Sequence, residues 1–131
     1  MTQTIVVLVV EDMPRFHQQI QKKLLDSGLV QEVIVAESII EATGAFDGSK
    51  SRLTAVLMDA CIEKDKPDTL ELTQYIRANF TGVIVAMSRD PGYRREQMRA
   101  GCNHQSPKHE VAEYLLKYLG TRIDMPAPSS I

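Results

Sequence analysis

Short apolar runs alternate along the chain with segments that have the periodicity of helices. Four runs, at residues 5–10, 33–36, 55–58 and 83–87, are rich in β-branched or other apolar side chains, and a weaker, more polar candidate lies at 102–106. Runs without polar alternation suit strands that are buried on both faces, as in a parallel sheet. The alternation therefore predicts an α/β fold, with an open parallel sheet that carries helices on both faces.

Helix start and stop signals separate the runs. After Pro14, a favoured first-turn residue, apolar side chains recur at helical spacing from Phe16 to Leu24. The other helix starts are predicted from capping boxes at Ser38–Glu41 and Asp68–Glu71, and from a cap followed by proline at Asp90–Pro91 and Ser106–Pro107. Gly101 and Gly120 are placed to end the last two helices.

Composition and charge exclude several classes of protein. The chain has 131 residues, 44% hydrophobic and 24% charged, which is the balance of one globular domain and not of a disordered chain. A formal net charge of −2 provides no basic footprint for nucleic acid or an anionic membrane. The longest aliphatic run is too short to span a bilayer, and two cysteines are too few for a disulfide scaffold. We expect a cytoplasmic protein with one domain at 1–122 and a tail or linker at 123–131.

Polar side chains follow four of the predicted strands. Glu11 and Asp12 come after the first, Asp59 ends the third, Ser88 follows the fourth and Lys108 comes after the fifth. Ligands of parallel sheets bind beyond the carboxyl ends of the strands, so we expect these side chains to meet. Crowded carboxylates repel one another unless they are protonated or share a cation, and Mg²⁺ suits such a site because it binds a few carboxylates together with water and phosphate oxygens. An aspartate can then attack a phosphoryl group, while the lysine offsets the developing charge.

This pattern resembles the receiver domain of two-component response regulators over about residues 5–120. The matching stretches are Val9-Val10-Glu11-Asp12-Met13-Pro14, Leu57-Met58-Asp59, Ala86-Met87-Ser88, and Ala100-Gly101 followed by Lys108. Each stretch lies at the corresponding place in the order of strands and helices. The resemblance implies a flavodoxin-like, doubly wound, five-stranded parallel sheet in the order 2-1-3-4-5, flanked by five helices.

The resemblance also implies a role for each polar residue. Asp59 would be the phosphoacceptor, Ser88 the hydroxyl switch residue and Lys108 the phosphate-contacting lysine, while Glu11, Asp12, Asp59 and the main-chain carbonyl of Cys61 would bind Mg²⁺. The phosphoryl donor would be a sensor histidine kinase or a histidine phosphotransfer protein, and a downstream protein target would respond. Such a domain catalyses only its own phosphorylation and dephosphorylation. Only eleven residues follow Gly120, so we expect no DNA-binding domain. We also expect no direct nucleic-acid binding, no membrane association and a monomer or weak dimer.

The sequence departs from the family pattern around the site. The charged loop after Asp59 is longer, the span from Ser88 to Gly101 is shorter, Gln105 stands where the family has an aromatic residue, and Pro107 precedes Lys108 instead of following it. The last departure predicts a different path for the loop that carries the lysine. These differences concern how a signal leaves the site more than they concern the phosphorylation chemistry.

Two other functions stay open. A receiver-like interaction module that does not switch by phosphorylation is favoured by the missing aromatic residue and the altered loops, whereas the intact Glu11, Asp12 and Asp59 count against it. A small aspartate-nucleophile phosphohydrolase is the less favoured alternative. Such enzymes commonly carry a second aspartate two residues after the nucleophile, where this chain has Cys61.

Overall fold

The chain folds into five strand–helix units. In the computed structural model, which describes residues 4–124, the elements in order are β1 (Val6–Val10), α1 (Pro14–Asp26), β2 (Glu32–Ala36), α2 (Ile39–Ser49), β3 (Ala55–Met58), α3 (Leu70–Asn79), β4 (Val83–Ala86), α4 (Pro91–Ala100), β5 (His104–Gln105), a 3₁₀ turn (Lys108–Glu110) and α5 (Val111–Asp124). Every strand and helix predicted from the alternation of apolar runs is present. The weakest strand candidate is also the shortest strand, β5.

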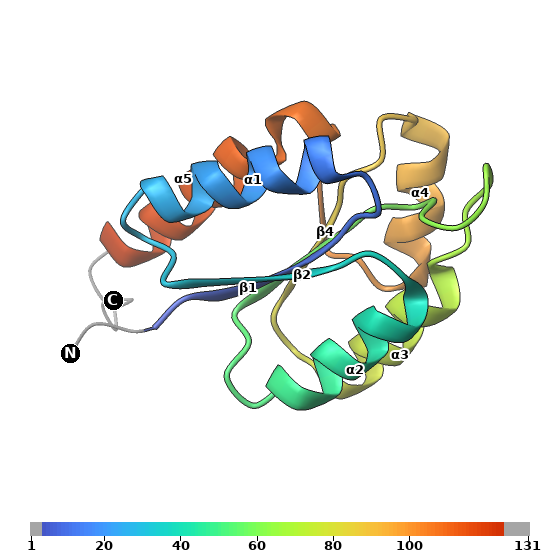
Figure 1. Ribbon diagram of the computed structural model, residues 1–131, viewed down its shortest axis with the longest axis horizontal. Helices are drawn as coiled ribbons and strands as arrows, with labels where there is room; N and C mark the ends of the chain where they lie inside the picture. Colours follow the sequence, from blue (N-terminus) through green and yellow to red (C-terminus); the bar gives the residue numbers. More distant parts are fainter. Residues whose placement is uncertain (1–3, 125–131) are drawn as a thin grey trace, which may run out of the picture.

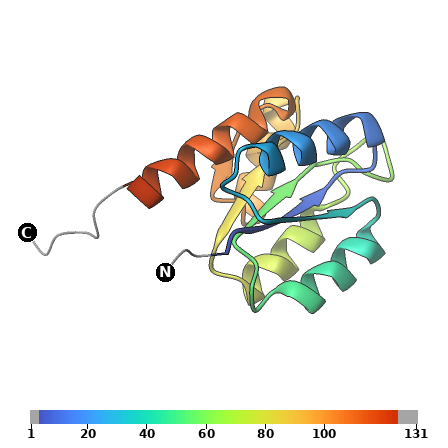
Figure 2. The same ribbon diagram turned by 60° about the vertical axis from the view of Figure 1, so that its left-hand side comes forward.

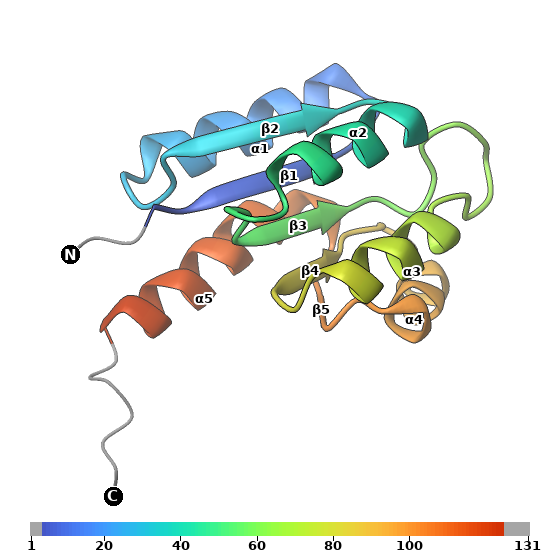
Figure 3. The same ribbon diagram turned by 90° about the horizontal axis from the view of Figure 1, so that it is seen from below.

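The five strands form one parallel sheet in the order β2-β1-β3-β4-β5. This is the flavodoxin-like arrangement that the resemblance implied, so the predicted fold class is confirmed. Helices α1 and α5 cover one face of the sheet, and α2, α3 and α4 cover the other (Figure 1, Figure 3). The strand order reverses direction at β1 and β3, which is where a ligand site is expected in a doubly wound sheet.

The continuous apolar run of β1 supplies both layers of the core. Val6, Leu8 and Val10 belong to the layer that packs against α2 and α3, whereas Val7 and Val9 belong to the layer that packs against α1 and α5. All five side chains are at most 1% exposed. Because an unpaired polar group would be costly on either face, the run shows no polar alternation.

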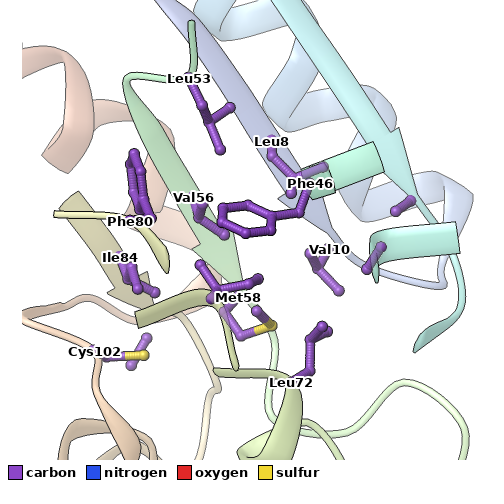
Figure 4. Packing of buried hydrophobic residues seen from close by; sticks show 14 of the residues in the cluster. Leu8, Val10, Phe46, Leu53, Val56, Met58, Leu72, Phe80, Ile84 and Cys102 are labelled. Carbon is purple, nitrogen blue, oxygen red and sulfur yellow. The ribbon is translucent and has the colours of Figure 1, made fainter. Parts of the chain in front are cut away.

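Phe46 of α2 lies in the middle of the first of these layers. Its ring is fully buried and meets the ring of Phe80 edge to face, with the centroids 6.1 Å apart. Figure 4 shows the ring beside Val56 of β3. This packing fixes β3, and the last residue of that strand, Met58, directly precedes Asp59. The core therefore fixes the backbone on which the candidate site is built.

The helix ends that were predicted from Ser38, Asp90 and Gly101 are confirmed. The Ser38 hydroxyl accepts a hydrogen bond from the N–H of Glu41 (3.1 Å), and Asp90 Oδ1 accepts one from the N–H of Gly92 (2.7 Å). Gly101 has a φ of 139° at the end of α4, a conformation that L side chains rarely adopt.

Asp68 does not cap α3 as predicted. The helix begins after Thr69, and the Asp68 carboxylate instead accepts hydrogen bonds from the backbone N–H groups of residues 62–64, at 2.7–3.0 Å. Three loop donors offer this carboxylate more hydrogen bonds than the first turn of a helix would. The residue therefore closes the charged loop between β3 and α3.

Two predictions at the ends of α5 are also wrong. Ser106 caps no helix, because its hydroxyl donates to the carbonyl of Pro107 and a 3₁₀ turn precedes α5. Gly120 does not end the helix, which continues to Asp124. A glycine inside a helix costs about 1 kcal/mol, and burial of Leu115 and Leu119 outweighs that cost.

The last turns of α5 extend past the edge of the sheet (Figure 2). The predicted tail, 123–131, lies almost wholly outside the described residues, and the domain boundary at 122 stays a prediction. None of the helices within residues 4–124 is both long and apolar enough to cross a membrane.

Candidate functional site

The register of the sheet brings the carboxyl ends of its central strands to one level. Val10 lies opposite Met58, and Met58 lies opposite Ala86. The polar residues singled out in the sequence lie within three residues after these ends or after the end of β5. One cavity of about 470 Å³ is lined by five of them, namely Asp12, Asp59, Cys61, Ser88 and Lys108.

Lys108 joins two buried carboxylates. Its ammonium nitrogen lies 2.7 Å from Oε1 of Glu11 and 3.0 Å from Oδ2 of Asp59. The contact with Asp59 is a hydrogen bond, and the contact with Glu11 is a close ion pair. Glu11 is 0%, Asp59 5% and Lys108 9% exposed. Charges this deeply buried persist only when they are paired, so the three side chains form one electrostatic unit.

Burial sets the protonation behaviour of this unit. Burial, with the charge of Asp59 adding to it, raises the pKa of Glu11 to about 7, and Lys108 opposes the shift. Burial also raises the pKa of Asp59, again against the pull of Lys108. Burial alone would lower the pKa of Lys108, but the two carboxylates together raise it. The lysine therefore stays charged at neutral pH, whereas Glu11 gains or loses its proton close to pH 7.

The loop before α5 delivers Lys108 to the site. Pro107 directly precedes the 3₁₀ turn, of which Lys108 is the first residue, and the described chain contains no cis peptide bond. The departure of Pro107-Lys108-His109 from the family order therefore does not keep Lys108 away from the carboxylates. His109 is exposed and pairs with Glu110 (Nε2 to Oε2, 3.3 Å), so it does not take part in the site.

Glu11, Asp12 and Asp59 form a group of donors that could hold a metal ion. Each offers one carboxylate oxygen, and these oxygens lie within 4.8 Å of one another. Lys108 contacts two of the three carboxylates, and the donors are all oxygen atoms, so the set fits a hard divalent ion such as Mg²⁺. Burial raises the pKa of the Cys61 thiol to about 11, which leaves that side chain neutral. The role implied for the Cys61 carbonyl stays a prediction.

Thr69 fixes the backbone of Asp59, and the sequence analysis missed it. The Thr69 hydroxyl is fully buried and donates to the carbonyl of Asp59 at 2.7 Å, with the carbonyl of Ala60 at 3.2 Å. One residue earlier in the chain, the carbonyl of Met58 accepts a hydrogen bond from the amide of Gln97 at 2.7 Å. Only a threonine directly before a helix and a glutamine on an otherwise polar helix mark these residues in the sequence.

Ser88 and Gln105 both connect to α4. The Ser88 hydroxyl accepts a hydrogen bond from the N–H of Asp90 (3.1 Å), and its carbonyl accepts one from the Arg94 guanidinium (2.6 Å). Arg94 also donates to the side chain of Gln105 at 3.3 Å. Gln105, which replaces the family's aromatic residue, is thus exposed and hydrogen-bonded to α4.

Phe16 does not lie in the core with Ile20 and Leu24, the apolar residues that share its helical spacing. The buried residues of α1 are His17, Ile20 and Leu24, and Phe16 is only half-buried. Its ring lies instead beside the site, with the Lys108 ammonium 4.6 Å from the ring centroid. The spacing of apolar residues could not distinguish a ring that packs in the core from one that packs on a lysine.

No family model and no curated protein matches the chain. Solved structures do match. A two-component response regulator from Clostridium difficile has a TM-score of 0.75 at 18% identity, over 93% of this chain and 100% of that one. The chemotaxis protein CheY4 from Vibrio cholerae has a TM-score of 0.72 at 22% identity, over 89% and 97% of the two chains.

A third similar structure is a longer chain. The RcsB response regulator from Salmonella typhimurium has a TM-score of 0.67 at 20% identity, and the match covers 98% of this chain but 65% of that one. Sequence identities of this size establish the fold, and the chemistry has to be argued from the residues of the site. The fold of this chain is that of the receiver domains of response regulators.

Proposed function

We propose that the chain is a phosphoacceptor receiver domain of a two-component phosphorelay. The observation that carries the proposal is the position of Lys108, whose ammonium contacts both Glu11 and Asp59 beside a third carboxylate, Asp12. The donor would be a sensor histidine kinase or a histidine phosphotransfer protein, and phosphorylation would change a surface that binds a downstream protein. The domain would turn over no separate metabolite.

Asp59 would be the nucleophile that attacks phosphorus. Its Oδ1 accepts a hydrogen bond from the N–H of Ala60 (2.9 Å), and its Oδ2 faces Lys108. In the transfer, a carboxylate oxygen of Asp59 forms a bond to phosphorus as the P–N bond of phosphohistidine breaks, and the electron pair leaves with the imidazole nitrogen. Water later attacks the phosphorus, the bond between the Asp59 oxygen and phosphorus breaks, and inorganic phosphate leaves as the carboxylate is restored.

The remaining residues stabilise charge. Lys108 would neutralise the phosphoryl oxygens as Asp59 loses its own negative charge. Glu11, Asp12 and Asp59, with the carbonyl of Cys61, would hold Mg²⁺, which supplies further neutralisation of the phosphoryl group when bound. Ser88 lines the same cavity, and its hydroxyl, whose oxygen accepts the N–H of Asp90, would donate its own proton in a hydrogen bond to a phosphoryl oxygen.

Acetyl phosphate with Mg²⁺ tests the proposal without a cognate kinase. Intact-protein mass spectrometry should show the addition of one phosphoryl group to the wild-type chain and none to Asp59→Asn. Asp65→Asn is the matched control, because Asp65 lines the same cavity but lies outside the cluster of three carboxylates. Absence of the mass increase over a range of Mg²⁺ concentrations would refute the proposal.

The interaction module is the second candidate, and the bond between Gln105 and Arg94 favours it. An exposed glutamine that is bonded to α4 cannot act as a buried aromatic switch does. A chain that takes up phosphate but whose α4 and β5 amide resonances do not change would support this candidate. The phosphohydrolase is weakened further, since the raised pKa of Cys61 makes the thiol a poor general acid at neutral pH.

A further inference from the structure

Three cations from three different elements surround the ring of Phe16. The guanidinium carbon of Arg15 lies 4.8 Å from the ring centroid, the ammonium of Lys108 4.6 Å, and the guanidinium carbon of Arg89 5.8 Å. All three distances fall within the range in which an aromatic face attracts a cation. Arg15 belongs to α1, Arg89 follows β4, and Lys108 lies in the turn after β5.

The ring of Phe16 gives the Lys108 ammonium a contact that is independent of the carboxylates. An ammonium on a flexible four-carbon stem has no fixed direction of its own, so its surroundings decide where it lies. Glu11 and Asp59 attract it, but the same carboxylates belong to the group that could hold a metal ion. The contact with Phe16 involves no carboxylate. This contact therefore does not compete with a divalent cation for the carboxylate oxygens.

Arg89 is a second cation of the same cavity. It lines the cavity together with Lys108, and the wall of that cavity also contains several acidic side chains. A phosphoryl dianion that approaches such a wall meets repulsion unless cations face it. Arg89 itself is exposed, so without a contact its guanidinium would move freely in solvent. The ring of Phe16 is the group that lies beside both cations.

We propose that Phe16 is a positioning residue for the phosphoryl-transfer site. Its ring orients the Lys108 ammonium toward Glu11 and Asp59 and keeps the Arg89 guanidinium at the rim of the same cavity. This inference rests on the proposed function, because the reaction it serves is the phosphorylation of Asp59. The geometric part, that the ring fixes Lys108, holds for the unphosphorylated chain and can be tested there.

Phe16→Leu and Phe16→Tyr separate the aromatic contact from ordinary packing. Leucine keeps an apolar side chain on α1 but has no aromatic face, whereas tyrosine restores the face. In NMR spectra of the unphosphorylated chain, nuclear Overhauser effects (NOEs) between the Lys108 ε-methylene and the Glu11 γ-methylene report the position of the ammonium without depending on the ring current of residue 16. We expect these NOEs to weaken in the Leu variant and to persist in the Tyr variant. NOEs of equal strength in the wild type and the Leu variant would overturn the proposal.

Phosphorylation kinetics test the second part. With acetyl phosphate, we expect the Leu variant to react about 3- to 10-fold more slowly at subsaturating donor, as the loss of a desolvated cation–π contact allows, and the Tyr variant to react at the wild-type rate. Arg89→Gln should raise the acetyl phosphate concentration needed for half-maximal rate. Arg95→Gln, an exposed arginine of α4, is its control. Equal rates for all four variants would contradict the role of Phe16.

The two proposals fail in different ways. If the wild-type chain takes up no phosphoryl group, the proposed function is wrong, and the NMR comparison still decides whether Phe16 positions Lys108. If the wild type is phosphorylated and the Leu variant matches it in both the rate and the NOEs between Lys108 and Glu11, only the inference about Phe16 is wrong. Thermal melts of the variants verify that each one is folded.

Discussion

The ammonium of Lys108 lies 2.7 Å from Oε1 of Glu11, a carboxylate that is fully buried. The same ammonium contacts Asp59 at 3.0 Å, so one positive charge serves two buried acids that come from neighbouring strands. This pairing makes the lysine part of the fold as well as part of the candidate chemistry.

Lys108→Met should therefore reduce stability as well as phosphorylation. Without the ammonium, Glu11 and Asp59 would be left as uncompensated buried acids, and we expect a loss of about 3 kcal/mol in the free energy of unfolding at pH 8. At pH 5 the loss should be smaller, because the carboxyls can take up protons. Urea denaturation at the two pH values measures this. Lys117→Met, at an exposed position on α5, should change little; equal losses for both variants would contradict the pairing.

The raised pKa of Glu11 predicts how stability depends on pH. Burial first, and then the charge of Asp59, raises its pKa from 4.5 to about 7. The folded chain then holds a proton that the unfolded chain releases, so in metal-free buffer the stability from this group is full below pH 4.5 and is lost as the pH rises through 7. Glu11→Gln should flatten that decline, as measured by urea denaturation across the window.

Added Mg²⁺ should reverse the trend at high pH. Metal binding requires ionised carboxylates, so the rise in melting temperature caused by Mg²⁺ should be larger at pH 8 than at pH 5.5. In Glu11→Gln the rise should be small at both pH values. A rise that is independent of pH in the wild type would show that the ion binds elsewhere.

Asp12→Asn should have opposite effects on the metal-free chain and on the binding of Mg²⁺. Asp12 is half-buried and lies close to two other carboxylates. Removing its charge should stabilise the metal-free chain by roughly 0.5 kcal/mol, the size of a partly exposed charge interaction, and should weaken the stabilisation by Mg²⁺. Thermal melts with EDTA and with Mg²⁺ give both numbers. A variant that is less stable in EDTA and unchanged in Mg²⁺ would disagree with the crowding of these carboxylates.

Thr69→Val should disturb the backbone of Asp59, because it removes a hydrogen bond to the Asp59 carbonyl. The change leaves the Asp59 carbonyl without the hydroxyl that donates to it, and we expect a loss of about 1–3 kcal/mol in stability together with slower phosphorylation. Thr69→Ser should restore both. Thr73→Val is a matched control, because the Thr73 hydroxyl donates to a carbonyl that already accepts the N–H of Thr73. Similar losses in the two valine variants would show that the hydrogen bond from Thr69 to Asp59 has no special effect.

The strands could be predicted because their residues are buried on both sides. Val6 to Val10 pack in two layers at once, so β1 is continuously apolar and stands out in the sequence. The acidic residues could be predicted to meet for a related reason. Glu11 and Asp59 follow adjacent parallel strands, and the topology alone places such positions at one edge. The strand order itself came from the family resemblance.

Residues whose roles depend on distant contacts could not be predicted. Phe16 has the spacing of a core residue, but its place beside Lys108 depends on a turn more than ninety residues away. Asp68 has the spacing of a capping residue, but the loop it closes offers it three donors. Gly120 has the signature of a helix end, but the packing of α5 overrides it. Local signals compete with tertiary contacts at each of these positions.

The site of phosphorylation tests the central claim most directly. After reaction with acetyl phosphate and Mg²⁺, borohydride reduces an aspartyl phosphate to homoserine, and peptide mass mapping then locates the product. We predict homoserine at position 59 in the wild-type chain and at no other position. A chain in which no aspartate is converted, or in which the product lies at a residue other than 59, would contradict the account.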